Sequence, residues 1–248
     1  MAKTLSLDDL WNNAAPGETT FRPESVSNLP EAARRYLQHA IAPGTRLASA
    51  VRLKMRGEIK LKRWFPFRAE EVICWNRGVI WQARVRMNGL LVMGADRMVD
   101  GEGAMRWKFL GMIPILAASS PDISRSAAGR FGAESMWLPS VLCGPDVSWI
   151  GQDSECARAR LAVQGHDVEV TLAIDDDGRL KAVGLQRWGN PGGGGFREAP
   201  FGGIAESEET FAGFTIPARL RVGWYPGTPQ FEAEGEFFRV TIDDALYR

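Results

Sequence analysis

Glu134 is the ionisable residue whose neighbours along the chain point most clearly to chemistry. On a helix, Phe131, Glu134 and Leu138 follow one another at spacings of three and four residues, which is typical of a buried stripe. A carboxyl group buried there beside Trp137 can act as a general acid or base near neutral pH. The structural alternative is an ion pair with Arg130, which stands one helical turn earlier.

Arg84 and Arg86 are candidates for binding an anion. They alternate along an expected strand with apolar residues such as Val85, so the arginines occupy one face and the apolar side chains the other. If the arginine face is concave, both guanidinium groups are donors for a ligand carboxylate or phosphate. If it is convex, both are solvated, and the alternation fits either case. For a cavity ligand we expect apolar contacts from Trp81, Met87, Met136 and Trp137.

Histidine and cysteine form no metal-binding or nucleophilic motif in this sequence. His39 and His166 have no partner at HxxxH or HExxH spacing, and Cys74, Cys143 and Cys156 contain no CxxC pair. A GxSxG nucleophile motif is also missing. We therefore expect no metal and no cofactor. Three cysteines, an odd number, favour reduced thiols in a core over a disulfide framework.

The charge pattern argues against a polyanion partner. Lysine and arginine number 30, aspartate and glutamate also 30, so the formal net charge is zero and bulk attraction to nucleic acid is missing. One strand carries the basic stripe Arg52, Lys54, Arg56, Lys60 and Lys62, which we interpret as a solvated sheet face. The glycine run 192–195 lacks the Lys-Ser/Thr of a phosphate loop. We expect no nucleic-acid partner.

Alternation with a period of two dominates the chain and predicts a mainly β protein. About a dozen segments follow it, beginning with residues 51–61 and ending with residues 232–242. Helical spacing is confined to the N-terminal segments 7–11 and 30–41 and to segment 122–138, where Gly129 and Gly132 weaken the helix. No βαβ alternation occurs, so we predict a single large curved antiparallel sheet, a half-barrel, with N-terminal helices and a mid-chain helical lid. We divide the chain into an N-terminal helix and loop extension, 1–28, and the half-barrel domain, 29–248.

Several segments, taken in order, resemble those of an uncharacterised bacterial family of unknown function. They include LPEAARRYLQHAI, VRLKMRGEIKL, WQARVRM, AESMWLPSVL and FAGFTIPARLRVGWY, and the resemblance spans about residues 29–242. It implies a fold similar to the lipoprotein carriers LolA and LolB, in which a helical lid closes a curved antiparallel sheet over an apolar cavity. Such a likeness implies a fold and a cavity, not an activity.

The N-terminal residues do not look like a secretion signal, because Asp8 and Asp9 stand where an apolar segment would be needed. The longest nearly apolar stretch, 109–118, is too short to span a bilayer. We therefore expect a cytoplasmic protein with no membrane span.

Three functions fit this sequence. The first is a binding protein for a hydrophobic or amphipathic small molecule, held in the concave sheet with Arg84 or Arg86 on an acidic head. The second is a cofactor-independent enzyme, a lyase, isomerase or hydrolase of a hydrophobic metabolite, with Glu134 as general acid/base. In the third, side chains fill the interior and the protein acts through a partner surface. The sequence leaves the ligand and the oligomeric state open.

Overall fold

All thirteen strands in the described residues, 5–151 and 153–248 of a computed structural model, belong to one antiparallel sheet. Their order is β6-β5-β4-β3-β2-β1-β13-β12-β11-β10-β9-β8-β7. Strands that follow one another in sequence therefore pair, except β6 and β7, which form the two edges, and the sheet is joined in the middle where the last strand, β13, pairs with β1. The mainly β fold class and the single antiparallel sheet predicted from the alternation are confirmed.

The bounds of the strands fall into two runs, one on each side of the central helix α3. The first run is β1 (Ala50–Lys60), β2 (Trp64–Cys74), β3 (Gly78–Met87), β4 (Leu90–Val99), β5 (Glu102–Phe109) and β6 (Ile113–Ala118). The second run is β7 (Ser148–Gly151), β8 (Cys156–Val163), β9 (His166–Ile174), β10 (Leu180–Gly189), β11 (Arg197–Phe211), β12 (Phe214–Trp224) and β13 (Glu236–Tyr247). The α-helices are α1 (Leu7–Asn12), α2 (Glu31–Ala40) and α3 (Pro121–Ala133).

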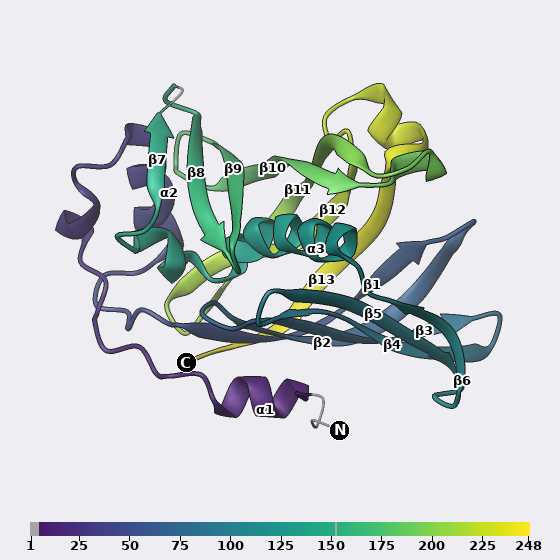
Figure 1. The fold of residues 1–248 in the computed structure, drawn as a ribbon. Coiled ribbons are helices and arrows are strands. Elements are labelled where there is room, and N and C mark those ends of the chain that lie inside the picture. The colour runs from purple at the N-terminus through teal and green to yellow at the C-terminus, as the bar shows by residue number, and fades with distance from the viewer. Residues whose placement is uncertain (1–4, 152) are drawn as a thin grey trace.

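The sheet curves so far that its two runs face each other across α3. Figure 1 shows strands β2–β6 below this helix and strands β7–β12 above it. Strong curling is expected of a twisted sheet with this many strands. The main hydrophobic core lies on the concave side, where apolar residues of both runs surround the buried side chain of Phe131 on α3. The helix thus occupies the inside of the half-barrel.

Helix α3 begins at a capping serine and is followed by two 3₁₀ turns. The Ser120 hydroxyl accepts a hydrogen bond from the backbone N–H of Ile123, and Pro121 fits the first helical turn. The helix ends at Ala133, earlier than the predicted residue 138, and the 3₁₀ turns η2 (Glu134–Trp137) and η3 (Pro139–Cys143) follow. Pro139 disfavours a helical conformation at Leu138, which has φ −131° and ψ 63°, and this residue separates η2 from η3.

Gly132 allows α3 to approach the sheet closely. A Cβ atom at this position would lie 2.6 Å from Cγ1 of Val168 on β9, which is closer than real Cβ atoms come. The glycine that weakens the helix in the sequence pattern is therefore required by packing.

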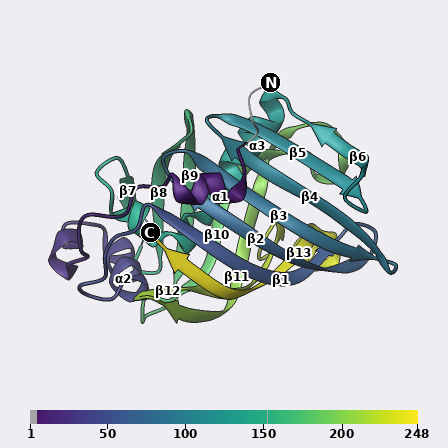
Figure 2. The ribbon, with the colours of Figure 1, turned by 90° about the horizontal axis from the view of Figure 1, so that it is seen from below.

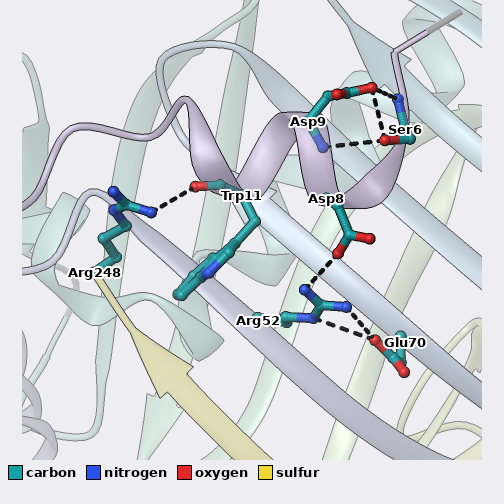
Figure 3. Close-up of polar contacts among 7 residues, drawn as sticks. All are labelled: Ser6, Asp8, Asp9, Trp11, Arg52, Glu70 and Arg248. Atoms are coloured by element: carbon teal, nitrogen blue, oxygen red, sulfur yellow. Dashed lines mark hydrogen bonds and ion pairs between the residues drawn. The ribbon is translucent and has the colours of Figure 1, made fainter.

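Helix α1 lies on the opposite, convex face of the sheet (Figure 2). Leu7 and Leu10 pack there in a small separate cluster, and Ser6 and Asp9 form a capping box at the start of the helix. Arg52 joins the helix to the sheet because its guanidinium lies 2.8 Å from an Asp8 oxygen and 2.7 Å from a Glu70 oxygen (Figure 3). No helix in the described part of the chain is both long and apolar enough to cross a bilayer.

Two local expectations were wrong. Strand β6 was not predicted, because its apolar sequence shows no alternation and contains Pro114, yet proline is tolerated there at the sheet edge. Residues 232–235 were predicted to begin the last strand, but they belong to a helical turn, Phe231–Gly235. The backbone N–H of Phe231 donates to the Thr228 carbonyl, and the buried Phe231 ring holds the turn in place.

We predict that Gly132→Ala destabilises the protein, although glycine-to-alanine changes inside helices normally stabilise by about 1 kcal/mol. The new methyl group would overpack against Val168, and we expect a loss of about 1–3 kcal/mol in the free energy of unfolding, measured by denaturant titration. Val168→Ala should make room, so that Gly132→Ala is neutral or stabilising in that background. An equal loss in both backgrounds would contradict this packing account.

Candidate functional site

A cavity of about 300 Å³ lies between α3 with η2 and both runs of the sheet. Most of its wall is apolar, and one part carries a group of charged side chains. Apolar wall residues from the sheet include Met55, Ile59, Val183, Val222, Phe237 and Phe238. The charged wall residues are Glu71, Asp96, Arg130, Glu134 and Arg187. The volume is at the lower end of the range for small-molecule sites, and an apolar wall with a few polar groups is typical of them.

A larger hollow of about 800 Å³ borders α3 on the side of β9 and β10, and four of its charged groups form two ion pairs. Arg125 lies 2.5 Å from Glu198, and Arg158 lies 3.0 Å from Glu169. Charges satisfied in this way at an exposed surface do not indicate a ligand site.

Arg130 on α3 is the centre of the charged group in the smaller cavity. Its Nε donates to Glu134 Oε1 over 2.5 Å, one N–H group donates to Glu71 Oε1 over 2.8 Å, and the other lies 3.7 Å from Asp96 Oδ2. Burial opposes the positive charge, but the carboxylates of Glu134, Glu71 and Asp96 outweigh this effect and raise the pKa of Arg130. One guanidinium therefore joins η2 to strands β2 and β4.

Glu71 is the most deeply buried acid of the group. Its side chain is 0% exposed, and burial together with the nearby Glu134 carboxylate raises its pKa well above the ordinary value, although Arg130 acts in the opposite direction. The two carboxyl groups bind the same guanidinium, that of Arg130, through Glu71 Oε1 and Glu134 Oε1. A proton on Glu71 would let them share a hydrogen bond, which supplies a donor for carboxylate oxygens that otherwise lack a partner in the described structure.

Asp96 is the third acid, and Trp107 holds it by donating its indole N–H to Oδ1 over 2.9 Å. Burial raises the pKa of Asp96, while Arg130 and Trp107 lower it in part. The cavity wall thus carries two acids, Glu71 and Asp96, that hold protons more firmly than exposed carboxyl groups do.

Two side chains on the cavity wall, Trp81 and Arg187, carry hydrogen-bond donors with fewer partners than those of Arg130. The buried indole N–H of Trp81 has no acceptor in the described residues. Arg187 on β10 donates its Nε–H to the Ser126 carbonyl over 3.0 Å, but no carboxylate of the described residues lies within 4 Å of its guanidinium. Burial and the positive charge of Arg130 lower the pKa of Arg187 to about 10. The wall therefore offers donors to any molecule in the cavity.

Aromatic rings hold Arg187 in position. Its guanidinium carbon lies 4.4 Å from the centre of the Phe201 ring and 5.6 Å from that of the Trp224 ring. Such cation–π contacts compensate a buried cation in part, yet they leave hydrogen-bonding positions unused. Arg187 also borders a second hollow of about 150 Å³ under the start of α3.

The sequence-predicted residues are divided between the cavity and the outside of the sheet. Glu134, Trp81, Met136 and Trp137 all line the cavity. The structural alternative for Glu134, an ion pair with Arg130, is confirmed. That these residues contact a ligand stays a prediction.

Arg84 and Arg86 do not face the cavity, so of the two alternatives left open by the sequence the concave one, with both arginines as ligand donors, was wrong and the solvated one holds. Both are exposed, because the alternate positions on β3, including Trp81 and Val85, are buried in the core. Met87 is half-buried against the core but is not part of the cavity wall. Arg84 and Arg86 could not contact a cavity ligand together with Trp81 and Met87. The arginines and these apolar side chains point to opposite faces of one strand.

The sequence analysis missed Glu71, Asp96 and Arg187 as site residues. A signal for Glu71 was present: it shares its strand face with Phe67, Ala69 and Ile73, which are buried. A charged residue at an inward position of a strand is unusual and requires a partner. The pairing of Glu71 with Arg130, 59 residues away, was not visible in the sequence.

The described residues hold no group of three or more His, Cys, Asp or Glu side chains arranged to bind a metal ion. Arg130 lies among the three carboxyl groups of the cavity and occupies the position where a cation would otherwise be expected.

We predict that Glu71→Gln removes a pH dependence of stability. A pKa raised in the folded state means that the folded protein holds a proton the unfolded chain releases, so wild-type stability should fall as pH rises above about 4.3. The stability of Glu71→Gln relative to wild type should therefore grow with pH, by at most about 1.4 kcal/mol per pH unit. Thermal unfolding across the pH range measures this, and parallel profiles would contradict it.

We predict that Trp137→Ala costs about 3–5 kcal/mol in the free energy of unfolding. The ring is only 4% exposed, and its N–H donates to the Pro217 carbonyl on β12 over 3.0 Å. Leu246→Ala is the control, because this residue is 50% exposed and should change stability by about 0.5 kcal/mol or less. A loss below about 1 kcal/mol for Trp137→Ala would show that η2 is not anchored to the sheet through this ring.

Comparison with known proteins places the chain in a family. No curated protein matches it. Among solved structures it is similar to a LolA superfamily protein from Nitrosomonas europaea, with 11% identity, 88% of this chain and 92% of that chain covered, and a TM-score of 0.42. It is also similar to a domain described as an outer membrane lipoprotein-sorting protein from Vibrio parahaemolyticus, with 10% identity, 81% and 86% covered, and a TM-score of 0.39.

These structural likenesses are weak, so the description of the fold rests on the strand order alone. The sequence match is far more extensive, because a protein-family model covers residues 27–247 and confirms the resemblance predicted from the sequence segments. The chain belongs to the family of unknown function DUF6920.

Proposed function

We propose that the protein binds a hydrophobic or amphipathic small molecule in the cavity beside α3. The observation that carries this proposal is the division of the cavity wall into an apolar part and a polar part in which the Trp81 N–H and one oxygen each of Glu71 and Glu134 lack a partner among the described residues. Cores normally satisfy their buried polar groups internally, and a group left without a partner at a cavity indicates a missing ligand or water.

The apolar part of the wall would hold the body of the ligand. Phe237 and Phe238 on β13 and Val222 on β12 line it together with Met55 and Met136. Methionine side chains adapt to irregular shapes, which suits a flexible hydrocarbon better than one rigid compound. Burial of such a chain would provide most of the binding energy.

The charged part would bind a polar head, and its free groups favour an acidic one. Once a proton joins Glu71 and Glu134, the groups left over are donors: the Trp81 N–H and the outer nitrogens of Arg187. Donors require an acceptor, and a carboxylate matches a guanidinium in shape and charge. Arg187 would thus have the anchoring role that the sequence analysis gave to Arg84 or Arg86.

We place this activity in the cytoplasm as part of the proposal. Cys74 is buried, Cys143 is half-buried, and both are free thiols. Free thiols suit a reducing compartment.

The proposal predicts that wild type binds octanoate more tightly than 1-octanol, followed by the fluorescence of the tryptophans in the cavity wall. Arg187→Met keeps the length and apolar stem of the side chain and removes the donors, so it should lose about tenfold or more in affinity for octanoate. The affinity for 1-octanol should change little. Arg160→Met, an exposed arginine outside the cavity, is the matched control and should behave as wild type.

Equal octanoate affinity in wild type and Arg187→Met would show that Arg187 is not the anchor. If neither compound binds wild type, the proposal of an amphiphile site is wrong.

A second candidate function is that of a cofactor-independent enzyme, a lyase, isomerase or hydrolase acting on a hydrophobic metabolite. The observation that favours it is the carboxyl pair of Glu71 and Glu134 on the cavity wall, held by Arg130 and able to share a proton. Glu134 would act as general acid/base. In that case Glu134→Gln should keep the fold and abolish turnover of any substrate found by screening, and unchanged turnover would remove Glu134 from the mechanism.

A further inference from the structure

One end of the molecule exposes an unusual number of large apolar side chains. We call this set the apolar rim; it comprises Leu90, Leu91, Leu110, Met112, Ile113, Ile115 and Leu116. Met112 is 73% exposed and Ile113 is 57% exposed. The rim residues come from the β3–β4 hairpin, the β5–β6 hairpin and the edge strand β6. A long exposed apolar edge promotes aggregation unless something covers it.

The rim is continuous because its hairpins are bonded to one another. The backbone N–H of Leu110 donates to the Leu91 carbonyl over 2.8 Å, which joins the β5–β6 turn to β4. Arg63 in the β1–β2 turn donates to Asn88 in the β3–β4 turn, so the tip of the first hairpin, with the exposed Leu61, lies beside the second. The tips of all three hairpins lie at the same end of the molecule in both views (Figures 1 and 2).

Next to the rim, the convex face of the sheet is basic. We call Arg68, Arg84, Arg86, Arg106 and Lys108 the basic face, since all are exposed and none has an ion pair or side-chain hydrogen bond in the described residues. Arg68 lies directly opposite Arg84 on the neighbouring strand, and Arg56 lies opposite Arg68. Like charges directly opposite each other in a sheet are destabilising, so this row favours an anionic partner.

Basic and apolar residues alternate where the two surfaces meet. Arg86 pairs across the strands with Leu91, and Lys108 pairs with Met93 and with Pro114 on β6. The basic stripe expected from the sequence differs from this face, because Arg52, Lys54 and Arg56 are already paired with acids. Within the described part of the chain, the cations of the basic face therefore remain unpaired beside the rim.

We propose that this end of the molecule docks on the surface of an anionic lipid bilayer. Exposed aliphatic side chains beside unpaired arginine and lysine are what a membrane interface accepts: the apolar groups enter the headgroup region and the cations meet lipid phosphates. The pattern fits a lipid surface better than nucleic acid, since the rim is aliphatic and carries no aromatic ring for base stacking. It also argues against a second copy of this chain, because a symmetric contact would bring two basic faces together.

Docking would bring the ligand cavity near the membrane. Ile59, which lines the cavity, stands two residues before Leu61 at the tip of the first hairpin. This inference does not depend on the proposed function, because its residues lie outside the cavity wall.

The test is co-sedimentation of the protein with vesicles of phosphatidylcholine alone or mixed with phosphatidylglycerol. We expect wild type to bind the mixed vesicles and to be released as salt is added. Arg84→Gln/Arg86→Gln/Lys108→Gln should reduce the partition coefficient by about tenfold or more. Leu110→Ser/Met112→Ser/Ile113→Ser should reduce it similarly, because the loss of inserted apolar area weakens a shallow contact.

Leu246→Ser/Arg160→Gln is the matched control, since both side chains are exposed and Leu246 is close to the C-terminus, at the other end of the molecule (Figure 1). It should bind vesicles as wild type does. Both surface variants should keep wild-type octanoate affinity, and Arg187→Met should keep wild-type vesicle binding, which separates failure of this inference from failure of the proposed function.

Three outcomes would overturn the inference. The first is wild type that remains in the supernatant with both kinds of vesicle. The second is a wild-type dimer in sedimentation equilibrium that the serine variant dissociates, which would assign the rim to a second copy. Binding to single-stranded RNA without binding to vesicles would assign the basic face to nucleic acid.

Discussion

The interaction on which the interior of this protein depends is the buried contact of one arginine with three carboxyl groups. Arg130 on α3 bonds Glu134 directly after the helix, Glu71 on β2 and, at 3.7 Å, Asp96 on β4. Burying any of these charged groups without a partner would cost free energy. The favourable position of the helix inside the curved sheet is therefore the one that keeps Arg130 in contact with the three carboxyl groups. The close approach at Gly132 and the anchoring of Trp137 to β12 act in the same direction.

The same contact leaves some buried polar groups of the interior without a hydrogen-bond partner in the described residues. Arg130 and Arg187 bring two positive charges to the cavity wall, against the carboxyl groups of Glu71, Glu134 and Asp96. Protonation of Glu71 would balance these charges, and the remaining capacity for hydrogen bonds would then lie on donors. A protein that only needed a stable core would gain by replacing such groups with apolar ones. Their presence beside an apolar cavity is what connects the architecture to ligand binding.

The sequence predicted the fold much better than the site. The strand segments alternate with a period of two, and the central helical segment repeats at three and four residues. Both the single antiparallel sheet and the central helix could therefore be recognised from spacing alone. Which strand face is concave could not, because Arg84 and Val85 alternate identically in both cases. That choice depends on where α3 lies, and α3 is held by Glu71 and Asp96, which are distant in sequence from Arg130. Glu134 was found because it lies on an apolar stripe within one helical segment, whereas Arg187 has no such local pattern and no ionic partner among the described residues.

The central claim is that the cavity is a binding site rather than a packing defect. Mass spectrometry of freshly purified protein under native and denaturing conditions tests it most directly. The account predicts a discrete added mass of an acidic amphiphile in the native spectrum that denaturation releases, or, for protein purified empty, one octanoate bound per chain on addition. A native mass equal to that of the bare chain, and unchanged when octanoate is added, would contradict the account.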